Sequence, residues 1–224
     1  MKVSQFWLRF FGISGIIGGL ILFVGDMLFY YQSGSTNLLM NMANASDERI
    51  LFSGVSALLA TWFYLLGLGQ ILVAFKPTKP MVRNIVLITF AGILTAYGVV
   101  HAEYVSIALT AKLAIQNQMD VELTSALASS INEALRLFVY PLFAVLSFVF
   151  ISQVWKRKTL YPRWVLFFFP LVPFLFQGLI AKILTGNIWT IVIGGFLNLI
   201  LVVFFTASTI ALWNVKLEEK AGND

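Results

Sequence analysis

Six ionisable side chains stand inside or at the ends of long apolar runs of this sequence, and they are the residues that could do chemistry. They are Asp26, His101, Glu103, Glu133, Arg136 and Lys182. Burying a charge among apolar groups is costly unless the charge is paired or faces a cavity. We therefore treat these side chains as candidates for binding a ligand or for pairing with one another.

The spacing of residues around His101 predicts a shared helical face. Tyr97, His101 and Tyr104 recur at i, i+4 and i+7, which places them on one side of an α-helix. Glu103 follows His101 by two residues and therefore points to a different side. If the face that carries Asp26 meets the His101 face, the two side chains come together. Deeper in the runs, the expected floor of such a cavity is formed by Gln70, Gln177 and Asn198.

Two kinds of chemistry fit this set. His101 could act as a general acid or base, with Asp26 or Glu103 orienting its ring. The same groups could instead bind a small molecule in a polar pocket within the apolar runs. The first alternative requires a carboxylate within hydrogen-bond reach of the imidazole, whereas the second requires only that the groups line one cavity.

A purely structural role competes with both. In that alternative Asp26 pairs with Arg136 or Lys182 and only fixes the packing of helices. Glu133, Arg136 and Tyr140 also share a helical face, so Glu133 and Arg136 could form an ordinary i, i+3 ion pair. Lys182 could extend its amine towards water at the end of its run.

Several kinds of catalytic site are excluded by the residues that the chain lacks. It has no cysteine and one histidine, so disulfides, thiolate nucleophiles, cysteine-based zinc sites and multi-histidine metal sites cannot form within the chain. The motifs G-x-S-x-G and H-E-x-x-H and a phosphate-binding glycine loop are also missing. We expect no metal and no cofactor, and we favour a binding role over an enzyme.

The composition places these runs in a membrane. Hydrophobic types make up 59% of the 224 residues and charged types 11%, whereas soluble domains average about 45–50% and about 25%. A hydrocarbon core of about 30 Å takes roughly 20 apolar residues per helix. We predict an all-α, polytopic transmembrane bundle of six helices in a single domain over residues 1–224, with spans at 7–31, 50–75, 84–109, 131–155, 164–184 and 188–213.

The basic residues predict the orientation of this bundle. Most of the 15 lysines and arginines lie near the N-terminus, in the second and fourth loops and near the C-terminus. The positive-inside rule places these segments, and so both termini, in the cytoplasm. This orientation also explains the net charge of +5 without nucleic acid as a partner. All six ionisable candidates then lie at the outer level of the cell membrane.

Three features predict where the helices deviate from straight, isolated rods. Pro170 and Pro173 predict a kink in the span at 164–184. The polar segment 110–130 is expected either as an amphipathic surface helix or as extensions of the third and fourth spans. Gly15 and Gly19 form a small-xxx-small pair that predicts close approach of another helix within the bundle.

The segment Gly25-Asp26-Met27-Leu28-Phe29-Tyr30, which closes a glycine-rich first helix, carries a resemblance to a known family. It resembles an uncharacterised family of bacterial six-helix integral membrane proteins with a Gly-Asp-Met motif ending the first helix. The single histidine in the third span fits the same family. The resemblance implies the fold and a bacterial inner membrane, adds weight to Asp26 and His101, and implies no substrate.

The sequence therefore predicts a multi-pass membrane protein with three possible roles. The first is binding or transport of a small molecule through an outward-facing polar pocket, with the lipid bilayer and that ligand as partners. The second is a structural or sensory membrane subunit, and the third is a membrane-embedded enzyme acting on a lipid or isoprenoid. The candidate ligand-binding residues are Asp26, Tyr97, His101, Glu103, Tyr104, Glu133, Arg136 and Lys182.

Overall fold

The computed structural model describes residues 4–215, and these residues form helices and connecting turns without a strand. The terminal residues 1–3 and 216–224, whose cytoplasmic location is predicted, lie outside the described residues. The helices are α1 (Gln5–Tyr30), α2 (Leu38–Ala43), α3 (Asp47–Ala74), α4 (Pro80–Gln116), α5 (Val121–Trp155), the 3₁₀ helix η1 (Arg163–Phe168), α6 (Leu171–Leu175), α7 (Gln177–Ile183), α8 (Gly186–Gly194) and α9 (Phe196–Leu212).

Four of these helices, α1, α3, α4 and α5, are long and apolar enough to cross a membrane. The pair α8 and α9 together passes the same test, although the two helices meet at an angle of 66°. The chain is thus an all-α protein with four or five candidate spans among residues 4–215. The first four predicted spans each fall within or close to one of the four long helices.

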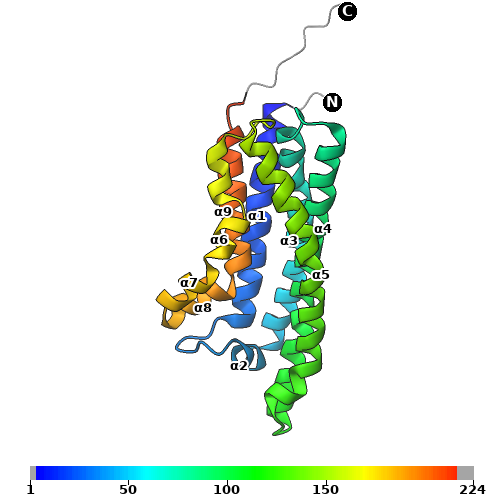
Figure 1. Ribbon diagram of the computed structural model, residues 1–224. Coiled ribbons are helices and arrows are strands. Elements are labelled where there is room, and N and C mark those ends of the chain that lie inside the picture. The colour runs from blue at the N-terminus through cyan, green and yellow to red at the C-terminus, as the bar shows by residue number, and fades with distance from the viewer. Residues whose placement is uncertain (1–3, 216–224) are drawn as a thin grey trace, which may run out of the picture.

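The polar segment 110–130 forms extensions of the membrane helices. It is divided between the end of α4 and the start of α5, which have 37 and 35 residues. At a rise of 1.5 Å per residue each helix is roughly 50–55 Å long, well beyond the roughly 30 Å of hydrocarbon. Of the two predicted alternatives, extensions of the third and fourth predicted spans are therefore confirmed, and a separate surface helix is not formed. Figure 1 shows the hairpin made by α4 and α5 projecting past α2.

The prediction of one continuous helix over residues 164–184 is wrong. The structure divides it into η1, α6 and α7, with Pro170 at the N-terminal boundary of α6 and Pro173 inside it. Proline has no N–H to donate and its ring clashes with the preceding turn, so two prolines this close prevent an unbroken helix. The predicted kink is confirmed as a break.

The predicted continuous helix at 188–213 is also interrupted. It bends between α8 and α9 at Gly195, where a Cβ atom would lie 2.3 Å from the ring of Phe23. Glycine has a low helix propensity, and its lack of a side chain lets Phe23 of α1 pack against the bend. The last two predicted spans therefore consist of short helical pieces.

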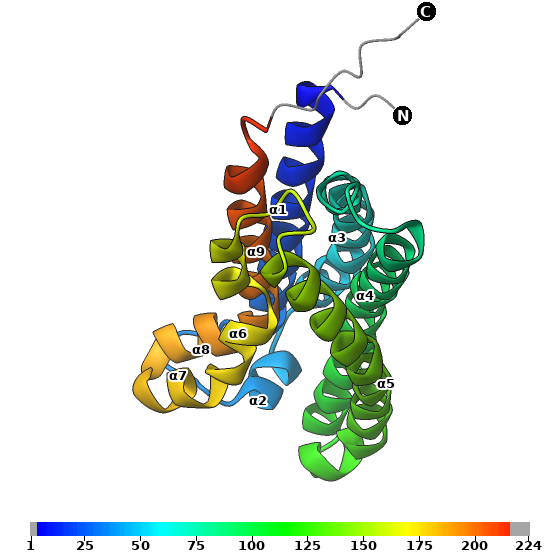
Figure 2. The same ribbon diagram turned by 45° about the horizontal axis from the view of Figure 1, so that its top comes forward.

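The long helices run along a common axis, with the start of α1 and the end of α9 at the same end (Figure 1). Side chains join these ends, because Gln5 Nε2 donates to Leu212 O at 3.3 Å and Arg9 Nε donates to Trp213 O at 3.2 Å. The helices α2, α7 and α8 lie towards the opposite end. Figure 2 shows the α4–α5 hairpin leaning away from α7 and α8.

Glycines let α1 and α3 pack backbone to backbone. A Cβ atom on Gly67 would lie 2.8 Å from the Cα atom of Gly15, and one on Gly15 would lie 2.3 Å from the ring of Phe205. Gly19 in turn faces Val202 of α9. The prediction that these glycines serve packing within the bundle is confirmed, and the contact sets the distance between the helices that carry the site.

We expect Gly67→Ala to lower the free energy of unfolding by about 1–3 kcal/mol, because the added methyl group meets backbone that cannot rotate away. Gly178→Ala is the matched control, since nothing lies within 4 Å of a Cβ atom there. Helix propensity alone predicts that the control is neutral or stabilising by about 0.5–1 kcal/mol. Thermal unfolding in detergent measures both, and equal effects would contradict the close helix contact.

Candidate functional site

Asp26 of α1 and His101 of α4 form a buried pair. His101 Nδ1 lies 3.1 Å from Asp26 Oδ1, and only 3% of His101 and 5% of Asp26 is exposed. This distance is that of a hydrogen bond between the imidazole and the carboxylate. The condition left open by the sequence, that the helical face of Asp26 meets the face of His101, is therefore met.

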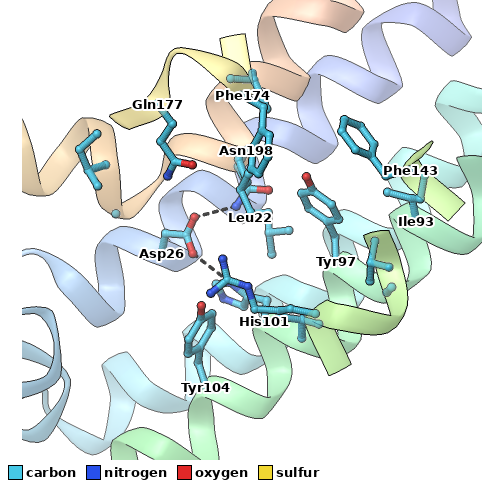
Figure 3. Close-up of a pocket in the computed structure, with 18 of the residues that line it drawn as sticks. Leu22, Asp26, Ile93, Tyr97, His101, Tyr104, Phe143, Phe174, Gln177 and Asn198 are labelled. Atoms are coloured by element: carbon cyan, nitrogen blue, oxygen red, sulfur yellow. Dashed lines mark hydrogen bonds and ion pairs between the residues drawn. The ribbon is translucent and has the colours of Figure 1, made fainter. Parts of the chain in front are cut away.

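The second oxygen of Asp26 is held by a residue from the other end of the chain. Asn198 Nδ2 of α9 donates to Asp26 Oδ2 at 2.6 Å, and Tyr64 of α3 donates its hydroxyl to Asn198 Oδ1 at 3.1 Å. Figure 3 shows Asp26 between His101 on one side and Asn198 on the other. Both carboxylate oxygens therefore have partners within the protein.

The other nitrogen of His101 faces α3. Its Nε2 atom lies 3.0 Å from Ser53 Oγ and 3.2 Å from Ser53 O, while the Ser53 hydroxyl is 2.7 Å from Gly25 O. We call the linked side chains Asp26, His101, Ser53, Asn198 and Tyr64 the polar network. It joins α1, α3, α4 and α9 through hydrogen bonds between buried side chains.

The structure explains why glycine precedes Asp26 in the first helix. A Cβ atom on Gly25 would lie 2.0 Å from Ser56 Oγ and 3.0 Å from His101 Nε2. Glycine at position 25 therefore leaves the space in which His101 reaches α3, and Asp26, the next residue, supplies the carboxylate. Ser56 donates to Ser53 O at 2.6 Å and fixes the same turn.

A cavity of about 230 Å³ lies beside the polar network. Its walls come from α1, α2, α4, α5, α6, α7, α8 and α9 (Figure 3). Apolar side chains form much of the wall. The polar side chains that line it are Asp26, Tyr30, Tyr97, His101, Tyr104, Arg136, Tyr140, Gln177 and Asn198.

Five of the eight predicted site residues line this cavity, and three lie elsewhere. Those at the cavity are Asp26, Tyr97, His101, Tyr104 and Arg136. Glu133 and Lys182 are exposed, and Glu103 accepts a hydrogen bond from Ser106 of its own helix at 3.2 Å. The periodicity that placed Glu103 on a different side from His101 explains why it is absent from the cavity wall.

The predicted cavity floor is correct for two of three residues. Gln177 and Asn198 line the cavity. Gln70 lies in a separate hydrogen-bonded cluster, where its Oε1 atom accepts from Ser208 at 2.6 Å and its Nε2 atom donates to Leu8 O at 3.3 Å.

Sequence reasoning missed Ser53 and Tyr64, the two hydroxyl groups of the polar network. Single hydroxyl residues are common in apolar helices, where they bond to their own backbone. Nothing in their type or spacing separated them from Ser56 or Thr61. Their roles follow only from the approach of α3 to α1 and α4.

The alternative ion pairs of the structural hypothesis are not formed. Within residues 4–215 the ion pairs are His101 with Asp26 and Lys112 with Asp47. Arg136 therefore has no carboxylate partner among these residues, although it lines the cavity. An unpaired guanidinium in an apolar surrounding favours an anionic group nearby.

The order Asp26–His101–Ser53 matches the hydrogen-bond order that activates serine nucleophiles. However, Ser53 has no exposed surface and does not line the cavity. Its hydroxyl group lies against Gly25 O, on the far side of the imidazole from the cavity. The geometry therefore indicates that these three residues hold the helices together and does not favour nucleophilic attack by Ser53 on a ligand.

Metal binding finds no donor set within the described part of the chain. No three histidine, cysteine, aspartate or glutamate side chains cluster there. The site is instead an Asp–His pair, one free cation and several phenol groups around an apolar space. Such a set can hold a small molecule by hydrogen bonds and one ionic contact.

The fold and this site define the class of protein: an all-α chain with several helices apolar enough for a membrane, built around a buried Asp–His network. The chain belongs to a family of unknown function (DUF6796), whose sequence profile matches residues 1–218. No curated protein and no solved structure matches it.

We expect the Asp26–His101 pair to show energetic coupling in a double-mutant cycle. Asp26→Asn and His101→Gln should each lower the free energy of unfolding by about 1–3 kcal/mol, because each leaves a buried polar group without its partner. The double variant should lose less than the sum, with a coupling of about 0.5–3 kcal/mol.

Unfolding in mixed micelles measures this cycle, and Glu103→Gln is the control. That change lies on the same helix outside the network and should stay within about 0.5 kcal/mol. Strict additivity of the two single changes would contradict the pair.

Proposed function

We propose that this chain is a multi-pass protein of the cell membrane that binds a small molecule in the cavity beside Asp26 and His101, from the outer side of the membrane, and moves it across. The observation that carries the proposal is the convergence of polar side chains from several helices on one cavity. Such convergence within an apolar bundle is typical of ligand sites.

The helix breaks support transport as well as binding. The end of α6 contributes Phe174 to the cavity and the start of α7 contributes Gln177, while the bend between α8 and α9 contributes Gly194 and Asn198. Irregular backbone inside a membrane is tolerated where it lines a cavity or is buried in protein. Transporters place their substrate sites at broken helices of this kind.

The path of the chain supports six crossings. After α5 the chain is at the end where α1 begins, because Leu160 N donates to Ala74 O at 2.8 Å beside the end of α3. It must return to the opposite end before α9 runs back. In this proposal η1, α6 and α7 make the fifth crossing in short pieces, and α8 with α9 makes the sixth.

The basic loops support the orientation of this bundle. The start of α4, the end of α5 and the start of η1 lie near the end of the bundle where α1 begins (Figure 1), and these segments carry Arg83, Lys156 and Arg163. The positive-inside rule assigns this end to the cytoplasm. We take the membrane to be the inner membrane of a bacterium. The cavity then lies towards the outer side, as the sequence predicts.

A structural or sensory role is the alternative, and one observation favours it. Every member of the polar network already has a protein partner. In that case the changes at Asp26 and His101 lower stability alone. A ligand that stabilises the protein through the cavity separates the two roles.

We expect single cysteines to report the orientation without background labelling, because the chain has no cysteine of its own. Asn117→Cys at the tip of the α4–α5 hairpin should react with a membrane-impermeant maleimide in intact cells. Lys158→Cys in the α5–η1 loop should react only after lysis. Labelling of both positions in intact cells would overturn the topology.

We expect Ala96→Trp to block the cavity, because Ala96 lines it. Ala102→Trp is the matched control on the exposed side of the same helix. A library of small organic acids, amines and alcohols is screened by thermal unfolding. A compound at a hundred times its Kd should stabilise the wild type and the control by about 2.7 kcal/mol, and Ala96→Trp hardly at all.

Asp26→Asn serves as the second arm of the same screen. Under the binding proposal it changes the response to the compound, and under the structural alternative it lowers the starting stability and leaves the compound's effect intact. If no compound stabilises the wild type more than Ala96→Trp, the binding proposal fails.

A further inference from the structure

A second hollow runs along α5 next to the cavity. This hollow, which we call the α5 groove, has a volume of about 650 Å³ and lies between α5 and the start of α6. Tyr140 and Phe143 line both the groove and the cavity. The groove therefore borders the proposed binding site, with these two side chains as their shared wall.

The walls of the groove suit an apolar chain. Much of the wall is apolar, with Phe143, Ala144, Phe148, Ile151 and Leu171. Ser147 lies between them, and Ser152, Trp155 and Lys156 line the groove at the C-terminal end of α5, away from Arg136. Only 17% of the residues in the apolar stretch of α5 are buried, against 39–50% in α1, α3 and α4. α5 is therefore the least covered of the four long helices, and Phe148 in the wall of the groove is 78% exposed.

One stripe of α5 connects the free cation to the groove. Arg136, Tyr140, Phe143, Ser147 and Ile151 follow one another at intervals of three or four residues and share one helical face. From the first to the last the helix rises roughly 22 Å, which is most of the roughly 30 Å hydrocarbon thickness. A molecule that follows this stripe has its polar end at Arg136 and its apolar end deep in the membrane.

The charges at the cavity select the sign of that polar end. Arg136 has no carboxylate partner within residues 4–215, whereas both oxygens of Asp26 accept hydrogen bonds from His101 and Asn198. Among the ionic side chains that line the cavity, the guanidinium is thus the one left for a ligand, and a guanidinium binds carboxylates and phosphates through two parallel hydrogen bonds. Tyr97 and Gln177 stand in the same wall as further donors.

We propose that the ligand is an anionic amphiphile whose carboxylate or phosphate binds Arg136 in the cavity and whose acyl chain lies in the α5 groove. The proposal rests on the binding function above and gives its substrate class. The ligand enters sideways from the outer leaflet of the bilayer, between α5 and α6, so it reaches the cavity from the outer side without an aqueous route.

The test is equilibrium binding of radiolabelled hexadecanoate to the full chain in phosphatidylcholine nanodiscs, with empty nanodiscs subtracted. Arg136→Gln should weaken binding by about tenfold or more, since a hydrogen bond to a charged group contributes about 1.5–3 kcal/mol. Ala144→Trp fills the groove and should weaken binding to a similar extent. Ala134→Trp, an exposed position of α5 outside both hollows, should change it less than about twofold.

Competitors separate the sources of the anion. Hexadecyl phosphate should displace hexadecanoate, whereas octanoate, hexadecanol and inorganic phosphate should do so poorly, because each lacks the long chain or the charge. Competition by inorganic phosphate equal to that of hexadecyl phosphate would overturn the lipid assignment. Thermal unfolding of each variant checks its fold, and Ala144→Phe replaces Ala144→Trp if the larger side chain prevents folding.

The failure of this inference differs from the failure of the proposed function. If Ala144→Trp binds hexadecanoate as the wild type does, while Ala96→Trp still abolishes stabilisation by small compounds, the cavity binds a ligand without a chain and the inference is wrong. If neither Ala96→Trp nor Ala144→Trp alters any binding, both proposals fall.

Discussion

The burial of one carboxylate is the constraint on which the rest of this structure depends. Asp26 can stay inside the bundle only because His101 and Asn198 hold its two oxygens. Those partners come from α4 and α9, so satisfying one acid fixes three helices relative to one another. Gly25 is part of the same solution, since any side chain there would collide with Ser56 and His101. Leaving such a buried group unpaired is far more costly than the pair is stabilising, which gives the network strong control over helix arrangement.

The cavity lies where the helices beside the polar network do not pack closely. The prolines at 170 and 173 and the bend at Gly195 prevent α6–α8 from packing as straight helices beside α5. The α4–α5 hairpin leans away from α7 and α8 (Figure 2). The cavity is lined by α4 and α5, by the short helices α6, α7 and α8, and by Asp26, His101 and Asn198 of the polar network. The closely packed helices α1, α3 and α9 therefore lie on one side, and the short helices α6, α7 and α8 lie on another.

The polar groups around the cavity divide into two sets with different physical roles. Asp26, His101 and Asn198 are bonded to one another and hold the helices. Arg136 has no ionic partner among the described residues, and with the tyrosines it faces the open space. The buried Asp26 and His101 can therefore serve the structure while the cavity serves binding. The groups that hold the helices need not be the groups that contact the ligand most strongly.

The sequence by itself determined the four long helices and their apolar character, because hydrophobic runs are local properties. It also located the deviation from a straight helix near Pro170 and Pro173, since proline acts on its own backbone. Only the tertiary structure decided that Asp26 meets His101, that Glu103, Glu133 and Lys182 lie outside the cavity and that Ser53 and Tyr64 complete the network. Those outcomes depend on the rotation and spacing of helices far apart in the chain, which Gly15, Gly25 and Gly67 set through contacts that no single segment contains.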